Sequence, residues 1–435
     1  MKSIYINRTL KNLLSAMLMV ALLILNQLAV GQTPVAKQQK PIAIAGATIH
    51  TMVSDPIENG TILFDKGKIM AIGTSITIPD DAEVINANGK HIYPGLIHAR
   101  SGTGLMEISR IAEGNDMSEE GNINPNLRLQ VAFNAVSEHL PAAAVSGVTT
   151  IVPSPTSGTI AGTTSAMVTE GWTWEQMTMK EGIGMVVNWP STRNAKEYCK
   201  QVDELQKAID DARRYMLARK AMQGGKTKAY HQYNIRWEAM IPVLKGELPL
   251  FISASNIKEI QAAIAWAQKE GIRMVLVGNR DLGLLAPQLA QLQIPVIVAG
   301  SIGGPTRQWE GYSEGYSTPL HLFNAGVEFC IAGDAFAPYA YRIHHHAAAA
   351  AAFGLPSDEA LKSITINAAK ILGIDDMVGS LEVGKDASLI VTDGHPLELS
   401  SSREQVFIQG RKIDMTDKHK RLYERYLEKH LQENL

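Results

Sequence analysis

The chain has 435 residues, of which 19% are charged and 45% hydrophobic, with 41 Lys and Arg against 43 Asp and Glu. This length and balance are typical of a globular protein with one large domain and a smaller one. The sequence contains no basic block and no low-complexity tract, so its composition argues against a nucleic-acid partner.

Residues 1–31 have the pattern of a secretory signal peptide. Lys2, Arg8 and Lys11 form a positive start, a thirteen-residue apolar run with one Ser follows, and small residues come next. A membrane anchor is the alternative, but a bilayer core needs about 20 apolar residues. We therefore expect export through the secretory route to a periplasmic or extracellular location, with no stable membrane anchor after cleavage and a linker over 32–40.

Short strands are predicted near both ends of the chain. Residues 41–92 alternate apolar and polar side chains, with Gly and Asp at the turns, and residues 380–415 have the same character. We expect the two segments to form one small β-sandwich domain, followed by a C-terminal helix over 416–435.

The segment 93–379 alternates apolar strands with helical patterns. Short continuous apolar strands are typical of a parallel sheet that is buried on both faces. Eight of them favour an α/β fold, a closed (β/α)8 TIM-like barrel. A long helix over 195–223 is an insertion in this order. The predicted strands cover 93–97, 148–154, 164–170, 183–189, 248–255, 272–278, 294–300 and 327–333.

Several stretches resemble the amidohydrolase superfamily, in particular its imidazolonepropionase-like branch. They are the closing "MVGSLEVGKDASLIV" and "VFIQGRKI", the helix "EALKSITINAAKILGI", the strand end "GVEFCIAGD" and the opening "YPGLI". The resemblance implies a metal-dependent hydrolase of C–N bonds, with its ligands after strands one, four, five, six and eight. In such a site imidazoles hold the metal, the metal turns water into hydroxide, and an Asp moves the proton.

At the matching positions this chain departs from the family. The two histidines after strand one correspond to Arg100 and Gly102, and the Asp before them corresponds to His98. Glycine has no side chain to offer, and arginine has only donors, so neither can ligate a cation. Asp334 alone stands at the position of a family residue, the catalytic Asp. We expect no metal at the family site and assign Asp334 as the candidate catalytic residue.

Other polar residues follow the predicted strands. Ser253 follows strand five, and Asn279 and Arg280 follow strand six. Because active-site residues of such barrels lie at the carboxyl ends of the strands, these side chains should line one cleft. Arginine binds carboxylates and phosphates through a forked pair of donors, so the cleft favours an anion. The predicted substrate-binding residues are His98, Arg100, Ser253, Asn279 and Arg280.

His344, His345 and His346 open a predicted helix shortly after Asp334. Consecutive helical residues point about 100° apart, so the three cannot all face one ion. Packing histidines are one outcome, and a displaced metal site that includes Asp334 is the other.

Three hypotheses for function stay open. In the first, an exported amidohydrolase-family protein without the usual metal centre binds a small anionic or amide-bearing ligand or serves as a partner subunit. In the second, the protein hydrolyses C–N bonds in non-peptide or dipeptide amides, using Asp334 with relocated zinc or another divalent metal, or with Arg100 as the electrophile. In the third, it is a structural or oligomerisation module, as a homo-oligomer or a paired amidohydrolase subunit. A direct Arg100–Asp334 pair would instead plug the barrel.

Overall fold

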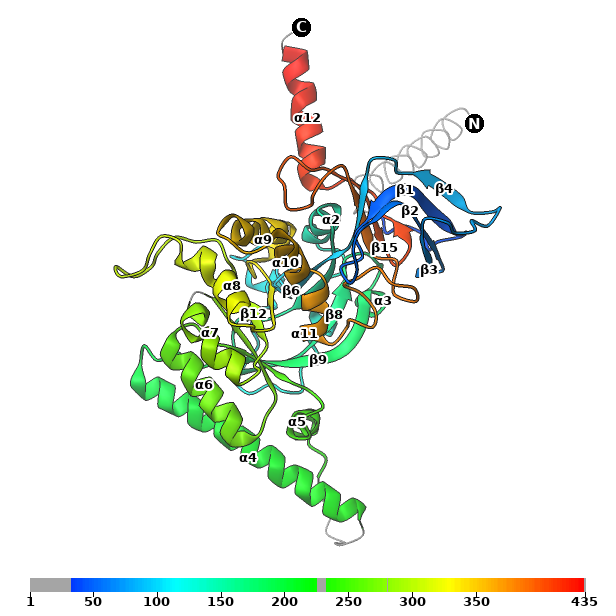
Figure 1. Cartoon of the computed structure of the whole chain (residues 1–435). Helices are drawn as coiled ribbons and strands as arrows, with labels where there is room; N and C mark the ends of the chain where they lie inside the picture. The colour runs from blue at the N-terminus through cyan, green and yellow to red at the C-terminus, as the bar shows by residue number, and fades with distance from the viewer. Residues whose placement is uncertain (1–32, 225–231, 280, 434–435) are drawn as a thin grey trace, which may run out of the picture. The chain divides into compact units, whose positions relative to one another are not determined.

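The computed structural model describes residues 33–224, 232–279 and 281–433 (Figure 1). The chain divides into two compact units, Met1–Pro34 and Val35–Leu435, and every helix and strand that the structure describes belongs to the second. Two of the sequence-based expectations, the signal peptide at 1–31 and the role of Arg280, fall outside the described residues.

Strands from both ends of the chain form one small sheet. Its order is β16-β15-β14-β5-β1-β2-β3, with β4 parallel to β1. The two chain ends meet where β5 runs antiparallel to β14, with Ile92 opposite Val391. All eight strands share this one sheet, and the expected sandwich layering stays a prediction. The strands are β1 (Ile42–Ile49), β2 (Ile57–Asp65), β3 (Lys68–Gly73), β4 (Glu83–Asn86), β5 (His91–Pro94), β14 (Leu389–Thr392), β15 (Arg403–Ile408) and β16 (Arg411–Lys412).

The turn between β2 and β3 follows directly from its sequence. Lys66 and Gly67 have φ angles of 47° and 80°, the left-handed conformation that a two-residue hairpin turn needs. Packing also requires the glycine, since a Cβ at Gly67 would lie 2.9 Å from the carbonyl oxygen of Gln409. The N-terminal hairpin therefore lies directly against the C-terminal strands.

The second sheet approximates a closed TIM-like barrel. Its order is β13-β12-β11-β10-β9-β8-β7-β6, and β13 lies beside β6 as well. Side chains from all eight strands, such as Ile97, Val152 and Phe251, form one buried cluster. The strands are β6 (Leu96–Ser101), β7 (Val148–Pro153), β8 (Ile160–Val168), β9 (Thr178–Asn188), β10 (Leu250–Ser253), β11 (Met274–Gly278), β12 (Val296–Val298) and β13 (Phe329–Ile331).

One strand of the barrel departs from the expected parallel order. β8 runs antiparallel to both β7 and β9, so the prediction of eight parallel strands separated by helices was wrong here. The reason is the length of the connection. Only residues 154–159 join β7 to β8, whereas a parallel crossover needs a dozen or more residues.

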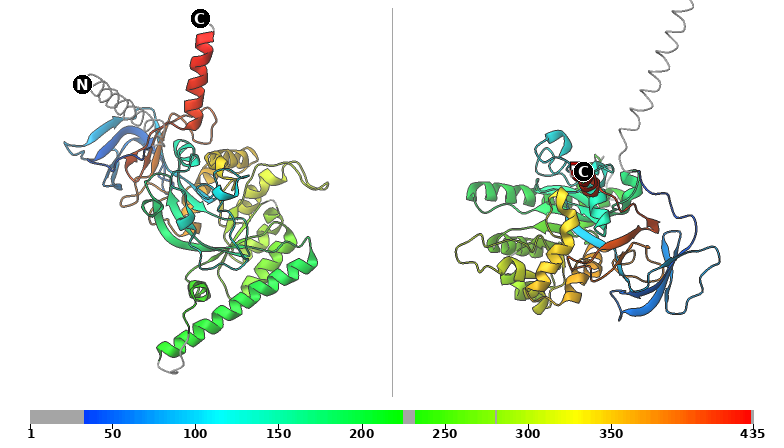
Figure 2. Two further views of the ribbon diagram at one scale, coloured as in Figure 1. Left: turned by 180° about the vertical axis from the view of Figure 1, so that it is seen from behind. Right: turned by 90° about the horizontal axis from the view of Figure 1, so that it is seen from above.

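Helices cover the outside of the barrel (Figure 2). Three of them, α4, α5 and α6, begin after an asparagine whose side chain accepts two backbone N–H groups of the first turn, the usual N-cap. The predicted helix over 195–223 is α4, with the same bounds. The described helices are α2 (His139–Val145), α3 (Trp174–Met177), α4 (Ala195–Gln223), α5 (Ile235–Leu244), α6 (Ile257–Glu270), α7 (Leu282–Gln291), α8 (Glu314–Asn324), α9 (Ile343–Ala352), α10 (Ser357–Ser363), α11 (Ile366–Leu372) and α12 (Lys418–Glu433), with short 3-10 helices at Ala112–Gly114, Leu129–Ala132 and Ala337–Arg342.

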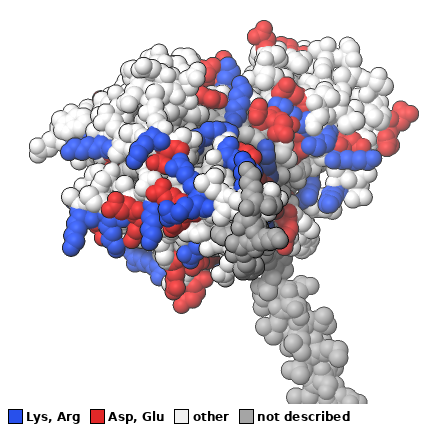
Figure 3. Space-filling view, turned by 90° about the horizontal axis from the view of Figure 1, so that it is seen from below, with Lys and Arg blue, Asp and Glu red and all other residues white. Residues whose placement is uncertain are grey.

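Basic and acidic side chains are interspersed on the face shown in Figure 3, without a continuous basic stripe on its described part. None of the described helices combines the length and the apolar character that crossing a bilayer requires. Both cysteines are free, with Cys199 exposed on α4 and Cys330 buried in β13.

Candidate functional site

A cavity of about 510 Å³ opens at the carboxyl ends of the barrel strands. This volume is in the range of small-molecule sites in proteins. Residues from the ends of β6, β7, β11, β12 and β13, and from the loops that follow them, form its lining together with residues of α8 and α9. The lining residues are Arg100, Met106, Ser109, Asn115, Met117, Thr156, Asn279, Ala299, Gly300, Ser301, Ile302, Gly303, Gly315, Asp334, Ala335, Phe336 and His346.

The structure brings three of the predicted site residues to this cavity, namely Arg100, Asn279 and Asp334. His98 and Ser253 are not part of the lining. Ser253 ends β10, and its carbonyl oxygen accepts a hydrogen bond of 2.8 Å from the backbone N–H of Trp189. Of the side chains predicted to share one cleft, His98 and Ser253 therefore lie outside the lining of this cavity.

His98, on β6, is fully buried. Burial, together with the neighbouring His346 and Arg100, lowers the pKa of its imidazole to about 3. The ring is therefore neutral at physiological pH.

Arg100 carries a positive charge into the cavity without a direct partner. Burial lowers the pKa of its guanidinium, and the carboxylate of Asp334 acts in the opposite direction. Among the residues that the structure describes, no ion pair or hydrogen bond engages this guanidinium, so the direct Arg100–Asp334 pair that would plug the barrel does not form. Asp334 instead accepts a hydrogen bond of 3.0 Å from the backbone N–H of Phe336.

The position of the second family histidine is closed by backbone. Gly102 N–H donates to the carbonyl oxygen of Ala335 at 2.8 Å, and a Cβ at Gly102 would lie 2.7 Å from that oxygen. The hydroxyl of Thr103 donates to the carbonyl oxygen of Ala337 at 2.8 Å. The loop after β13 is thus fixed against the end of β6, and an imidazole at Gly102 has no room unless this loop moves.

His346, on α9, is a cavity residue that the sequence left open. The backbone N–H of Ser301 donates to His346 Nδ1 at 3.1 Å, and the Ser301 hydroxyl donates to the His346 carbonyl oxygen at 2.7 Å. Burial lowers the pKa of His346 to about 4, although Asp334 opposes this shift. A neutral imidazole whose Nδ1 accepts a hydrogen bond carries its proton on Nε2. His346, a lining residue of the cavity, therefore carries a neutral N–H donor at Nε2.

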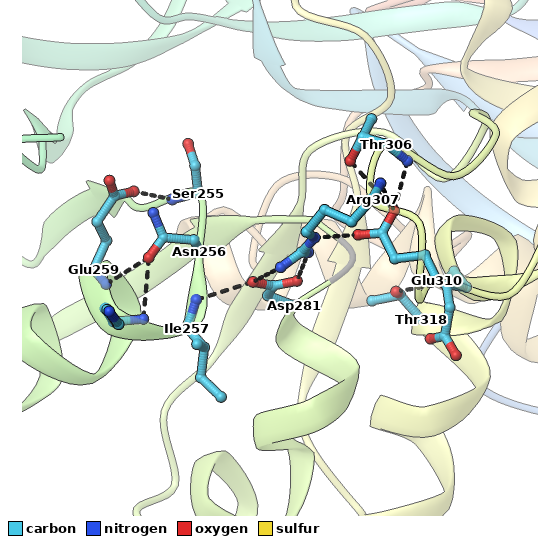
Figure 4. Close-up of polar contacts among 11 residues, drawn as sticks. Ser255, Asn256, Ile257, Glu259, Asp281, Thr306, Arg307, Glu310 and Thr318 are labelled. Atoms are coloured by element: carbon cyan, nitrogen blue, oxygen red, sulfur yellow. Dashed lines mark hydrogen bonds and ion pairs between the residues drawn. The ribbon is translucent and has the colours of Figure 1, made fainter. Parts of the chain in front are cut away.

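A second polar cluster lies at the same rim and holds the loop after β12 (Figure 4). The guanidinium of Arg307 lies between two carboxylates and donates to Asp281 and Glu310. Asp281 also accepts the backbone N–H of Ile257, at 3.0 Å. The two carboxylates raise the pKa of Arg307. No sequence pattern pointed to this cluster, because its members follow different strands.

The resemblance gives the positions of Arg100 and Gly102 to metal-binding histidines. Arg100 and Gly102 supply no ligand atom, and a fixed positive charge repels a cation. Across 33–224, 232–279 and 281–433, no group of three or more His, Cys, Asp or Glu side chains is arranged to hold a metal. His344 and His345 are absent from the cavity lining. Of the three histidines considered for a displaced metal site with Asp334, the lining therefore includes His346 alone.

Comparisons with known proteins agree with this architecture. The model of the amidohydrolase family matches residues 306–416. Amidohydrolase tasK of Hapsidospora irregularis is 22% identical over 391 residues, which are 81% of this chain and 39% of that protein. An imidazolonepropionase of Shewanella baltica (strain OS185) is 53% identical over 51 residues, 12% of each chain.

Among solved structures, an amidohydrolase from Thermotoga maritima MSB8 has a TM-score of 0.78 and 25% sequence identity. The match covers 86% of this chain and 99% of that one. The fold, the family model over 306–416 and these relatives agree with one another, and each of them is a similarity to amidohydrolases.

Proposed function

We propose that the cavity binds a small molecule with an anionic or amide oxygen, and that Arg100 anchors it in place of the metal of related hydrolases. One observation carries this proposal: the Arg100 guanidinium lines a cavity of about 510 Å³ and has no partner among the described residues. A buried charge needs a counter-charge or strong hydrogen bonds. A ligand oxygen supplies both.

The electrostatics of the cavity support an oxygen ligand over a metal ion. Two unit charges about 4 Å apart interact by roughly 4 kcal/mol at an effective dielectric near 20, and a divalent ion doubles the repulsion from Arg100. The neutral His346 adds a second donor without adding charge. A planar carboxylate, with two acceptor oxygens, matches a forked arginine.

Hydrolysis is the second candidate, because Asp334 lines the same cavity as Arg100. In this scheme Asp334 accepts a proton from water as the water oxygen attacks the amide carbon. The Arg100 N–H groups stabilise the oxyanion. Asp334 then returns the proton to the leaving nitrogen as the C–N bond breaks.

Two further features complete the proposal. The basic and apolar pattern of 1–31 supports export to a periplasmic or extracellular location. The family resemblance supports two alternatives to a ligand-binding role. The chain associates with another amidohydrolase subunit, or it serves as an oligomerisation module.

Calorimetry with benzoate and benzamide tests the binding proposal, because the two probes share their shape and differ in charge. A charge-assisted hydrogen bond contributes about 1.5–3 kcal/mol, so Arg100→Ala should weaken benzoate binding roughly ten- to a hundredfold. Arg110→Ala is the matched control, since Arg110 is exposed on the loop after β6 and lies outside the lining. Equal affinities of the purified protein and Arg100→Ala for both probes would overturn the proposal.

An amidase and dipeptidase screen, with and without chelator, tests hydrolysis. Turnover that survives chelation and disappears in Asp334→Asn supports the metal-free scheme. Turnover that requires stoichiometric zinc contradicts both the scheme and the expectation of a metal-free site, and elemental analysis of the purified protein measures that zinc.

A further inference from the structure

Contacts with the described residues of the barrel hold helix α12 at its first turn. The buried Asp417 accepts the backbone N–H of Lys420 through Oδ1 at 2.9 Å, and its carbonyl oxygen accepts the N–H of Arg421 at 3.0 Å. Arg421 also pairs with Glu138, just before α2, at 3.1 Å. No residue of α12 is buried. Figures 1 and 2 show the helix pointing away from the barrel.

The projecting turns carry an apolar stripe. Leu422, Tyr423, Tyr426, Leu427 and Leu431 are spaced by three and four residues, so they share one face. Their exposed fractions run from 39% at Leu422 to 68% at Tyr423. An isolated helix of this length is marginally stable in water, because nucleation is costly and most helical stability comes from packing of the apolar face. The helix therefore needs something to cover this stripe.

The distribution of charge along α12 indicates what covers the apolar stripe. Residues 418–425 hold four Lys and Arg against one Glu, whereas residues 426–433 hold two Glu against one Lys, Lys429, which pairs with Glu433 at 3.4 Å. In an antiparallel pair, the basic start of one helix lies beside the acidic end of the other, whereas a parallel pair places like charges together. A bilayer of anionic lipid favours a basic polar face, and the two glutamates at the outer end oppose that.

We propose that α12 is a self-association surface that pairs antiparallel with α12 of a second copy of this chain. The pairing is isologous, so each contact occurs twice. Lys418 and Glu433 lie on the same edge of the stripe, because fifteen residues correspond to about 60° around a helix. Lys418 of each copy therefore faces Glu433 of the other.

The mass of the purified protein in solution, measured by sedimentation over a range of concentrations, tests this pairing. The protein should be dimeric, and Leu427→Glu should raise the dimer dissociation constant roughly a hundredfold, because it places two carboxylates in an apolar interface. Leu427 is exposed in the single chain, so the variant should fold normally. Gln432→Glu, on the polar face, is the matched control and should leave the dimer intact.

Charge reversal tests the antiparallel direction. Glu433→Lys should weaken the dimer on the order of fivefold, because it converts two attractive surface contacts into repulsive ones. Adding Lys418→Glu to the same chain should restore the affinity. A monomeric purified protein, or a dimer that Leu427→Glu leaves unchanged, overturns the proposal. Failure of Lys418→Glu to rescue overturns the antiparallel arrangement, and monomers that float with phosphatidylglycerol vesicles through Leu427 would assign the stripe to a membrane.

Discussion

Two arginines at the carboxyl-terminal rim of the barrel have opposite surroundings. Arg307 donates to the carboxylates of Asp281 and Glu310, which raise its pKa. Arg100 lines the cavity without a direct partner among the described residues, and burial lowers its pKa. Both are arginines on loops or strand ends of one rim, so residue type alone does not separate them.

The difference indicates two roles: Arg307 stabilises the fold, and Arg100 is available to bind a ligand. The cluster around Arg307 fixes the loop that supplies Ile302 and Gly303 to the cavity. Among residues 33–224, 232–279 and 281–433, none occupies the donors of Arg100. A charge whose partners all lie within the fold contributes to stability, and removing one partner exposes the other to a desolvation cost. A charge without partners lowers stability and gains its counterpart from solution.

The largest expected effect belongs to Arg307→Ala. Asp281 is only 1% exposed, and the variant removes its counter-ion. Loss of one partner of a buried pair typically costs about 3–5 kcal/mol. Urea unfolding should report a loss of this order, while Arg193→Ala, at an exposed site, should stay within about 0.5 kcal/mol of the parent. An unchanged urea midpoint for Arg307→Ala would contradict the stabilising role assigned to the Arg307 cluster.

Gly102→Ala should cost roughly 1–3 kcal/mol of unfolding free energy, the usual range for overpacking. Its Cβ would lie 2.7 Å from the carbonyl oxygen of Ala335, which is backbone and cannot rotate away. For the same reason, the double variant Arg100→His and Gly102→His should not bind stoichiometric zinc, as measured by elemental analysis. Tight zinc binding by this variant would show that the loop after β13 moves easily.

Acid should destabilise the protein below pH 6.5. The pKa values of His98 and His344 are lowered to about 3 and that of His346 to about 4, from 6.5. The unfolded chain binds these protons first, so stability is fully present above pH 6.5 and falls as the pH drops toward 4. Each histidine contributes at most about 1.4 kcal/mol per pH unit. His346→Gln should reduce the slope of unfolding free energy between pH 6.5 and 4, and an unaltered slope would contradict the neutral state assigned to this ring.

The smallest effect on stability is expected for Arg100→Met. Replacing an unpaired, partly buried charge by an apolar side chain is often neutral or stabilising, here by up to about 1 kcal/mol. Binding of benzoate should fall in the same variant. A marked loss of unfolding free energy in Arg100→Met would show that Arg100, like Arg307, stabilises the fold.

Sequence patterns predicted the features that depend on local chemistry. The bounds of α4 follow from an Asn cap and a continuous helical pattern, and the hairpin at Lys66 and Gly67 follows from its turn residues. The predicted ends of the strands indicated that Arg100, Asn279 and Asp334 lie at one rim of the barrel. The motifs near the end of the chain indicated the family that it resembles. These features require only periodicity, turn chemistry and the rule that barrel strands end together.

Tertiary structure decided the rest, because the deciding contacts join residues far apart in the chain. The direction of β8 depended on a connection too short for a crossover. The exclusion of His98 and Ser253 from the cavity depended on where each lies in its strand. The hydrogen bond from Ser301 to His346, 45 residues later in the chain, and the closure of Gly102 by Ala335 leave no trace in local sequence. Only the folded chain shows that Arg307 pairs with two carboxylates, whereas Arg100 has no direct partner in the described part of the chain.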